Sequence, residues 1–254
     1  MGEVSDRRQQ GYENARDLLL QLVTDDGFLA STVARDNYRR IWARDGVIIG
    51  LAALMTGMDS LVETMRKTLK TLAEHQGEHG EIPSNVDTST HRISYGGTTG
   101  RVDADLWFVI GCTEYWLATG DETFLAEMLP ALERVRFLLG AWEFNDRGLI
   151  YVPQTGDWAD EYLQTGYILY DQLLYLQASR CFCRIHHHVH GSADHRLEDR
   201  TIRLCHLIRS NYWFNGAEPE DVYHEVLYRK GQQASPRRGS RYWMPFFSPT
   251  GYGY

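Results

Sequence analysis

The amino-acid sequence predicts an all-α protein in which helical hairpins stand side by side as an α/α toroid. Three observations lead to this prediction: short Gly–Asp turns recur, the helix before each turn is apolar on nearly every side, and the helix after it has one apolar stripe. Few strands are expected, because runs of alternating apolar and polar residues are scarce. The 254 residues are 43% hydrophobic and 24% charged, as in ordinary globular proteins.

The turns share a pattern around Gly57 (LMTGMDSLVETM) and Gly120 (LATGDETFLAEM), and a third candidate lies around Gly191 (HGSADH). Glycine adopts the left-handed conformation at the end of one helix, and Asp, Ser or Thr opens the next. Links this short join antiparallel helices. The glycines are 63 and 71 residues apart, which predicts a repeated helical hairpin.

The two helices of each hairpin differ in their apolar residues. Val47–Met55 and Leu106–Ile110, before the turns, are almost wholly apolar and therefore predict buried inner helices. After the turns, apolar residues follow helical spacing on one face, which predicts outer helices. These stripes are Leu61, Val62, Met65, Leu69 and Leu72 in the first hairpin, and Leu125, Met128, Leu129, Leu132, Val135 and Leu139 in the second.

The long connections, about Gln76–Val102 and Ala141–Thr165, lie at the end of the toroid opposite the tight turns. Functional residues concentrate in such connections. The predicted starts of the three inner helices place Asp close to Trp, and two of them also contain Arg; the third continues into Tyr167–Asp171. A single Asp there is often only a helix cap, but three Asp–Trp pairs at one end favour a common pocket. The segments are IWARDG from Ile41, GRVDADLW from Gly100 and GDWADE from Gly156.

Clustered carboxylates in an aromatic pocket suit the hydrolysis of glycosides. One carboxylic acid protonates the leaving oxygen, and partial burial beside other negative charges raises its pKa enough to do so. A second carboxylate activates water or attacks the anomeric carbon. Further Asp and Arg side chains bind sugar hydroxyls. The sequence therefore predicts a carbohydrate as substrate.

The order of the motifs resembles the six-hairpin (α/α)6 glycosidases. The nearest likenesses are the amylo-α-1,6-glucosidase domain of glycogen-debranching enzymes and the alkaline/neutral invertases; the mannosylglycerate hydrolases and trehalases are more distant. The matching segments are Trp42–Asp45, Gly80–Ser84, Val102–Ala104 with Trp107, Thr119–Asp121 and Phe247–Gly253.

The resemblance implies an inverting glycosidase that acts on a small sugar or a glucan end, foremost like an amylo-α-1,6-glucosidase. Invertase-, trehalase- and mannosylglycerate-hydrolase-like activities are the alternatives. Trp158-Ala159-Asp160, with Asp171 eleven residues on, resembles the "MID…E" arrangement of the invertases, which implies Asp160 as the catalytic proton donor. The invertases have Glu where Asp171 stands and Arg-Arg where Glu161 and Tyr162 stand. The implied substrate-binding residues are Trp42, Arg44, Asp45, Asp103, Trp107, Trp158 and Asp171.

We expect residues 1–254 to be one catalytic toroid domain, the N-terminal part of an (α/α)6 fold that is truncated at its C-terminus. Six hairpins of the observed period would take about 400 residues, and this chain has room for about four. No residue here matches the base of the resembling families, so the isolated chain is expected not to hydrolyse glycosides. A non-catalytic carbohydrate-binding protein is therefore an alternative. A sugar lyase or epimerase would need a base such as His91 or Tyr95 at the cavity.

Other classes of partner are not favoured. The net charge of −8 argues against nucleic acid and anionic membranes, and no apolar run approaches the roughly 20 residues of a membrane span. The four cysteines lack disulfide or zinc spacing and no secretory signal is evident, so we expect a reduced, cytoplasmic protein. The histidines of His186–His190 are interpreted as a solvated helix end. No metal or cofactor is expected, and the sequence does not indicate an oligomeric state.

Overall fold

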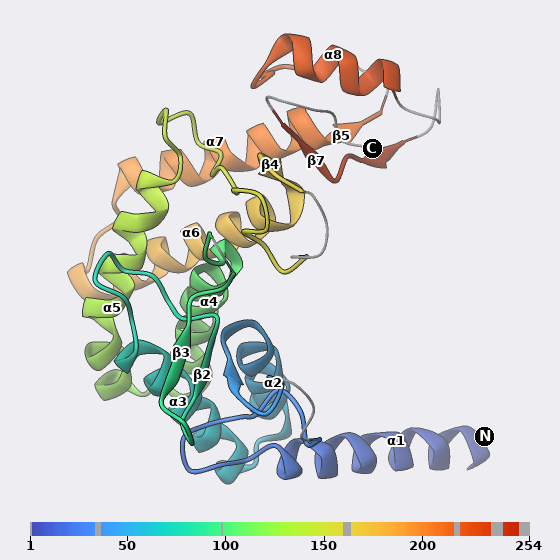
Figure 1. Cartoon of the computed structure of the whole chain (residues 1–254), viewed down its shortest axis with the longest axis vertical. Coiled ribbons are helices and arrows are strands. Elements are labelled where there is room, and N and C mark those ends of the chain that lie inside the picture. Colours follow the sequence, from blue (N-terminus) through green and yellow to red (C-terminus); the bar gives the residue numbers. More distant parts are fainter. Residues whose placement is uncertain are drawn as a thin grey trace.

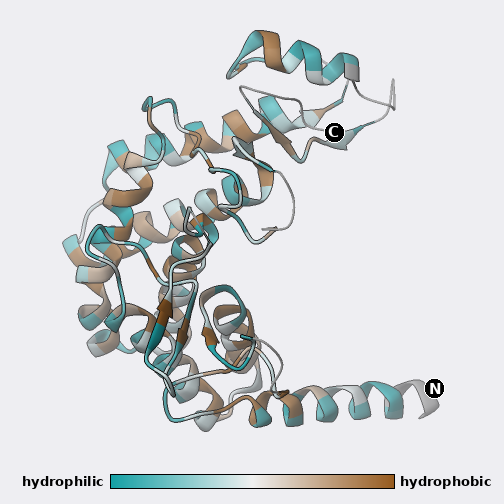
Figure 2. Cartoon of the chain, viewed as in Figure 1, coloured by the Kyte–Doolittle hydropathy of each residue, from teal (hydrophilic) through white to brown (hydrophobic). Residues whose placement is uncertain are grey.

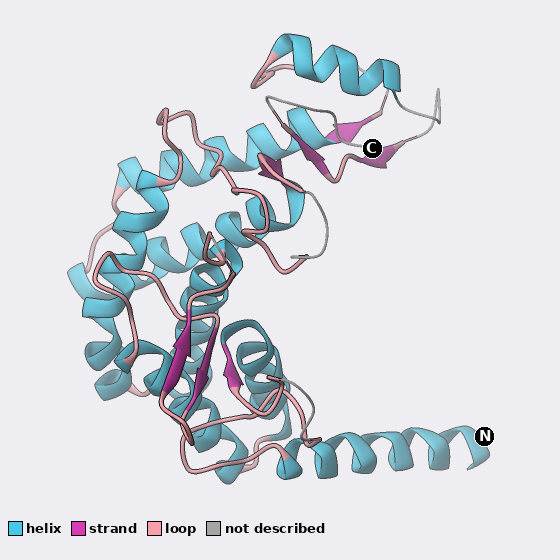
Figure 3. Cartoon of the chain, viewed as in Figure 1, coloured by secondary structure: helices cyan, strands magenta, loops and turns pink. Residues whose placement is uncertain are grey.

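The computed structural model describes residues 2–33, 37–97, 99–159, 164–215, 219–234 and 241–248. Helices dominate it and the strands are two or three residues long (Figure 3), so the all-α prediction is confirmed. The helices are α1 (Gly2–Gln21), α2 (Ala43–Thr56), α3 (Asp59–Glu74), α4 (Val102–Thr119), α5 (Glu122–Ala141), α6 (Leu169–His190), α7 (His195–Tyr212) and α8 (Glu225–Ala234). The strands are β1 (Ile41–Trp42), β2 (Asn85–Asp87), β3 (Arg92–Ser94), β4 (Tyr167–Ile168), β5 (Trp213–Phe214), β6 (Tyr242–Trp243) and β7 (Phe246–Phe247).

Three helical hairpins follow one another along an open arc: α2 with α3, α4 with α5, and α6 with α7 (Figure 1). The inner helices α2, α4 and α6 contact one another in this order, and each packs on its own outer helix. This is the predicted α/α toroid arrangement. The sequence left room for about four hairpins; the described residues form three, and α8 contacts β7 instead of pairing with a neighbouring helix.

The predicted Gly turns close all three hairpins. Gly57, Gly120 and Gly191 end the inner helices in the left-handed conformation, with φ of 65°, 68° and 67°. Asp121 and Asp194 then cap the outer helices by accepting backbone hydrogen bonds of 2.9 and 3.1 Å. The first hairpin differs, because its cap residue is Met58, which makes no side-chain cap.

The apolar stripes predicted from the sequence form the core. Leu61, Met65, Leu69 and Leu72 of α3 are fully buried, as are most stripe residues of α5. The inner helix α4 lies between α2 and α6 and is the most deeply buried of the three. Its close approach to α2 requires Gly111, since a Cβ there would lie 2.8 Å from the Val47 side chain.

Short strands hold the ends of the hairpins where the inner helices begin. β1 runs directly into α2 and pairs antiparallel with β2, which pairs with β3. β4 runs into α6 and pairs with β7 near the C-terminus. The backbone at these helix starts is therefore fixed by segments far away in sequence.

The first helix, α1, projects from the body of the molecule (Figure 1). It is largely hydrophilic, and its apolar residues gather at the end nearest the other helices (Figure 2). Tyr12 and Leu18 remain half exposed, so α1 gains little from packing within the described chain.

Candidate active site

A cavity of about 250 Å³ opens where the inner helices α2 and α4 begin. Five of the residues predicted to bind substrate meet on its wall, although they come from three separate segments of the chain. Tyr38, Ser84, Arg101 and Ala104 complete the lining and were not predicted as site residues. The five predicted residues are Trp42, Arg44, Asp45, Asp103 and Trp158.

An ion pair between α2 and α4 forms the polar centre of this cavity. Arg44 Nη1 donates to Asp103 Oδ2 at 3.0 Å, and Arg44 Nη2 lies 3.5 Å from Asp45 Oδ2. Asp103 is only 2% exposed, and this burial raises its pKa, while the charge of Arg44 acts in the opposite direction. The cavity thus holds a guanidinium between two carboxylates, all capable of bonding sugar hydroxyls.

Tyr170, in the first turn of α6, connects the third hairpin to this centre. Its hydroxyl donates to Asp103 Oδ2 at 3.4 Å and accepts from Trp107 Nε1 at 2.8 Å. Its ring also packs edge-on against Trp158, with ring centroids 6.3 Å apart. Trp107 was predicted to bind substrate, but it does not line the cavity; its indole bonds Tyr170, whose hydroxyl bonds Asp103. Tyr170 stands directly before Asp171 in the sequence, and this pairing of an aromatic residue with Asp is the signal that could have identified it.

The loop that leads to Asp160 is attached to the start of α4. Arg101 donates to the carbonyl oxygens of Thr155 and Asp157, and the Val102 amide donates to Gly156 at 2.8 Å. These bonds hold the backbone just before Trp158. Asp160, the predicted proton donor, lies outside the described residues.

Two buried carboxylates near this centre lack full hydrogen bonding. Asp157 Oδ1 accepts from the Ala159 amide at 2.8 Å, but its Oδ2 has no partner among the described residues, and neither has either oxygen of Asp171. Burial raises the pKa of both groups, and the charges of Asp103 and Asp157 raise that of Asp171 further. Asp171 is fully buried in α6 and outside the cavity lining, which differs from its predicted place on the wall.

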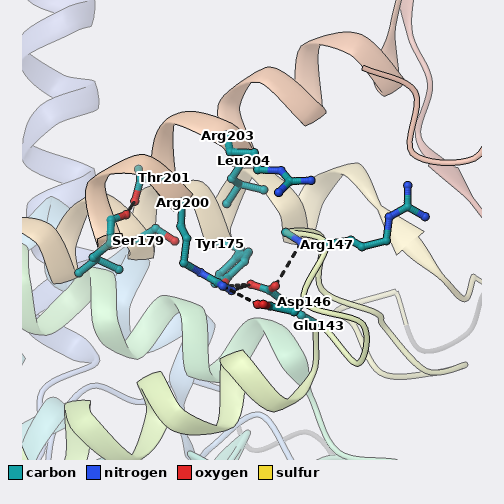
Figure 4. A pocket seen from close by; sticks show the side chains of 11 residues that line it. Glu143, Asp146, Arg147, Tyr175, Ser179, Arg200, Thr201, Arg203 and Leu204 are labelled. Atoms are coloured by element: carbon teal, nitrogen blue, oxygen red, sulfur yellow. Dashed lines mark hydrogen bonds and ion pairs between the residues drawn. The ribbon is translucent and has the colours of Figure 1, made fainter. Parts of the chain in front are cut away.

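Another buried carboxylate network lies away from this cavity, between α6, α7 and the end of α5 (Figure 4). Glu143 is 2% exposed and accepts from Tyr175 Oη at 2.7 Å, from Arg200 Nη2 at 2.6 Å and from the Gly148 amide at 3.1 Å. Arg200 also pairs with Asp146 at 2.5 Å. One adjoining pocket is about 50 Å³, and a second, which Asp146, Tyr175 and Arg200 also line, is about 550 Å³.

The other residues singled out in the sequence do not add to the cavity. The Tyr95 hydroxyl donates to the His75 carbonyl at 2.9 Å, and His91 is an exposed turn residue. His188 pairs with Glu122 at 2.7 Å. Within the described ranges, no group of three or more His, Cys, Asp or Glu side chains is placed to hold a metal ion. None of the described helices has the length and apolarity needed to cross a membrane.

An arc of helical hairpins with an acidic, aromatic cavity at the starts of its inner helices defines the class of six-hairpin glycosidases. In agreement, the chain is similar in fold to a GH78 rhamnosidase of Bacillus sp. GL1, with a TM-score of 0.59, 18% identity, and coverage of 79% of this chain and 20% of that one. A rhamnosidase from Klebsiella oxytoca, solved with rhamnose bound, gives a TM-score of 0.57, 19% identity, and coverage of 79% and 38%.

Within this class, the chain belongs to the alkaline and neutral invertase family, whose profile matches residues 27–235. No curated protein matches the chain. The chain spans about a fifth to two-fifths of the length of the two rhamnosidases.

Proposed function

We propose that the cavity binds the sugar at the bond to be cleaved and that the protein hydrolyses sucrose by acid–base catalysis. The observation that carries this proposal is the meeting of Trp42, Arg44, Asp45, Asp103 and Trp158 around one cavity. The family to which the chain belongs is described as alkaline and neutral invertase, which favours sucrose among the possible substrates.

The residues of the cavity have complementary roles in this reaction. Trp42 and Trp158 offer aromatic faces to the apolar side of a sugar ring. Arg44, Asp45 and Asp103 bond the hydroxyls, and their mutual ion pairs hold them in position before substrate arrives.

The proposed proton donor is Asp160, two residues after Trp158 in a loop that Arg101 and Val102 attach to α4. The protonated carboxyl transfers its proton to the glycosidic oxygen as the bond breaks. In an inverting reaction, the outcome implied by the resemblance, a base activates water on the opposite face of the ring. The base is not assigned to a residue of this chain.

An α-1,6-linked glucan end is the second candidate substrate, because Trp42–Asp45, Gly80–Ser84 and Thr119–Asp121 also resemble the glycogen-debranching enzymes. Sucrose and isomaltose therefore form a decisive pair of probes. Tryptophan fluorescence of the 254-residue chain, titrated with each sugar, measures binding without requiring turnover. We expect sucrose to bind more tightly, and Trp42→Ala to weaken its binding at least ~10-fold. A preference for isomaltose would replace sucrose by the α-1,6 linkage, and sucrose binding that Trp42→Ala leaves unchanged would remove the cavity from the proposal.

The role of Asp160 is tested by comparing sucrose hydrolysis by the protein with that of its Asp160→Asn variant. Asp160→Asn is expected to lower kcat by ~10²–10⁴, the usual contribution of a general acid, while sucrose still binds. Glu161→Gln is the matched control and is expected to retain activity. Retained activity in Asp160→Asn, with loss in Glu161→Gln or Asp157→Asn, would move the proton donor to that residue.

A further inference from the structure

The short ribbon formed by β5 and β6 displays two tryptophans that the proposed reaction does not use. Phe214 and Tyr242 are paired across the ribbon, and Phe214 packs inward on Tyr228 with ring centroids 4.9 Å apart. Because neighbouring strand residues point to opposite faces, Trp213 and Trp243 lie on the other face. Their ring centroids are 5.0 Å apart, and Trp243 is 48% exposed.

A cavity of about 420 Å³ lies beside Trp213. One wall is the C-terminal part of α7, where His206, Arg209 and Ser210 follow the i, i+3, i+4 spacing of a single helix face. The segment after β5 supplies Asn215 and Glu220. In the part of the chain that the structure describes, the guanidinium of Arg209 and the carboxylate of Glu220 have neither a hydrogen-bond nor an ion-pair partner.

The position of this cavity relates it to the candidate active site. Since α7 runs antiparallel to α6, its C-terminus returns to the end of the hairpins where the inner helices begin (Figure 1). The ribbon therefore stands on the same end of the toroid as the cavity of Asp103, in a later hairpin of the arc.

We propose that this cavity is a second carbohydrate-binding site, which takes a neutral oligosaccharide. The ring of Trp213 would stack on one pyranose, and Arg209 and Glu220 would bond its hydroxyls. One cation and one anion at the cavity balance each other, which suits an uncharged polyol better than a phosphate or a carboxylate. Cross-strand packing explains why the two tryptophans touch, but it does not explain the polar cavity beside them.

Maltotriose is the probe, titrated by calorimetry into the 254-residue chain carrying Trp42→Ala and Asp103→Asn, so that the candidate active site is weakened. We expect binding to persist in this background and to fall at least ~10-fold when Glu220→Gln is added. Glu225→Gln is the matched control, because Glu225 lies on α8, outside the cavity, and pairs with Arg229. Circular dichroism establishes that each variant is folded.

Glu220→Gln leaves the pair of Trp213 and Trp243 in place, so its effect on binding does not depend on disturbing the ribbon. Loss of binding in Glu220→Gln but not in Glu225→Gln supports the second site. No binding of maltotriose in the Trp42→Ala, Asp103→Asn background, or equal binding in both glutamate variants, overturns it. Because sucrose binding at the first cavity is measured separately, failure of either proposal leaves the other standing.

Discussion

Two groups of buried carboxylates in this chain differ in their hydrogen bonding. Glu143, between α6 and α7, accepts hydrogen bonds from a tyrosine, an arginine and a backbone amide. Asp157 and Asp171, near the candidate active site, have three carboxylate oxygens without a partner among the described residues. Both groups are at most 2% exposed, so burial alone does not separate them.

This difference in hydrogen bonding predicts different roles for the two groups. A fully bonded buried carboxylate fixes the elements around it, here the end of α5 against α6 and α7. Buried carboxylates without partners cost stability, and such groups with raised pKa values cluster at catalytic sites. The comparison therefore predicts that the Glu143 network adds to stability, whereas Asp157 and Asp171 lower stability beside the cavity in which Asp103 is expected to bind sugar.

The largest expected effect is on the structural network. Arg200→Met removes the cation that pairs with the buried carboxylate of Glu143, which is expected to lower the free energy of unfolding by about 3 kcal/mol. Urea denaturation measures this change. Arg203→Met, one turn away and exposed, is the control and should stay within about 0.5 kcal/mol. Equal stability of the two variants would show that the network is dispensable.

The next effect is on ligand binding. Asp103→Asn removes the charge that pairs with Arg44 and is expected to weaken sucrose binding by ~10- to 100-fold. Asp105→Asn is the control, since Asp105 is equally buried but accepts from the Ile82 amide and lies outside the cavity. Fluorescence titration compares the two. Similar losses in both would assign the effect to helix α4 as a whole.

A smaller effect concerns stability and pH. Because the pKa of Asp171 is raised above its ordinary value of 3.8, the folded state resists ionisation of this group. Stability is therefore lost as the pH rises from about 4 through the folded pKa. Asp171→Asn should remove this loss and raise the free energy of unfolding at pH 7 by about 1 kcal/mol. Denaturation at pH 4 and pH 7 measures it, and an unchanged pH slope would contradict the argument.

The smallest effect is expected at the rim. The Asp45 side chain is 36% exposed, so Asp45→Asn is expected to weaken sucrose binding only by ~2- to 5-fold. The fluorescence titration with sucrose, carried out at ordinary and at high salt, measures this change in affinity. A loss as large as that of Asp103→Asn would show that exposure does not rank these carboxylates.

Much of the fold could be predicted from local sequence. The glycines that end the inner helices, and the stripe from Leu61 to Leu72, depend only on neighbouring residues and on helical spacing. Five residues of the cavity could also be predicted, because Asp and Trp recur before or at successive inner helices that a toroid brings to one end. The third of these segments was wrongly placed at a helix start, since α6 begins at Leu169 and Trp158 lies in the loop before it.

The remainder depended on contacts between distant segments. Trp107 and Trp158 both stand close to Asp in the sequence, but Trp107 donates a hydrogen bond to Tyr170 whereas Trp158 lines the cavity. The network of Glu143 joins residues up to 57 positions apart, and no local pattern marks it. The polar cavity beside Trp213 likewise arises only where α7, β5 and the following segment meet.

By itself, the sequence determined the hairpins, their inner and outer helices and the acidic, aromatic end of the arc, because these follow from periodicity and turn chemistry within about twenty residues. Only the tertiary structure decided which carboxylates are paired and which are left without partners. That choice depends on which side chains of neighbouring hairpins come within hydrogen-bonding distance once the inner helices have packed.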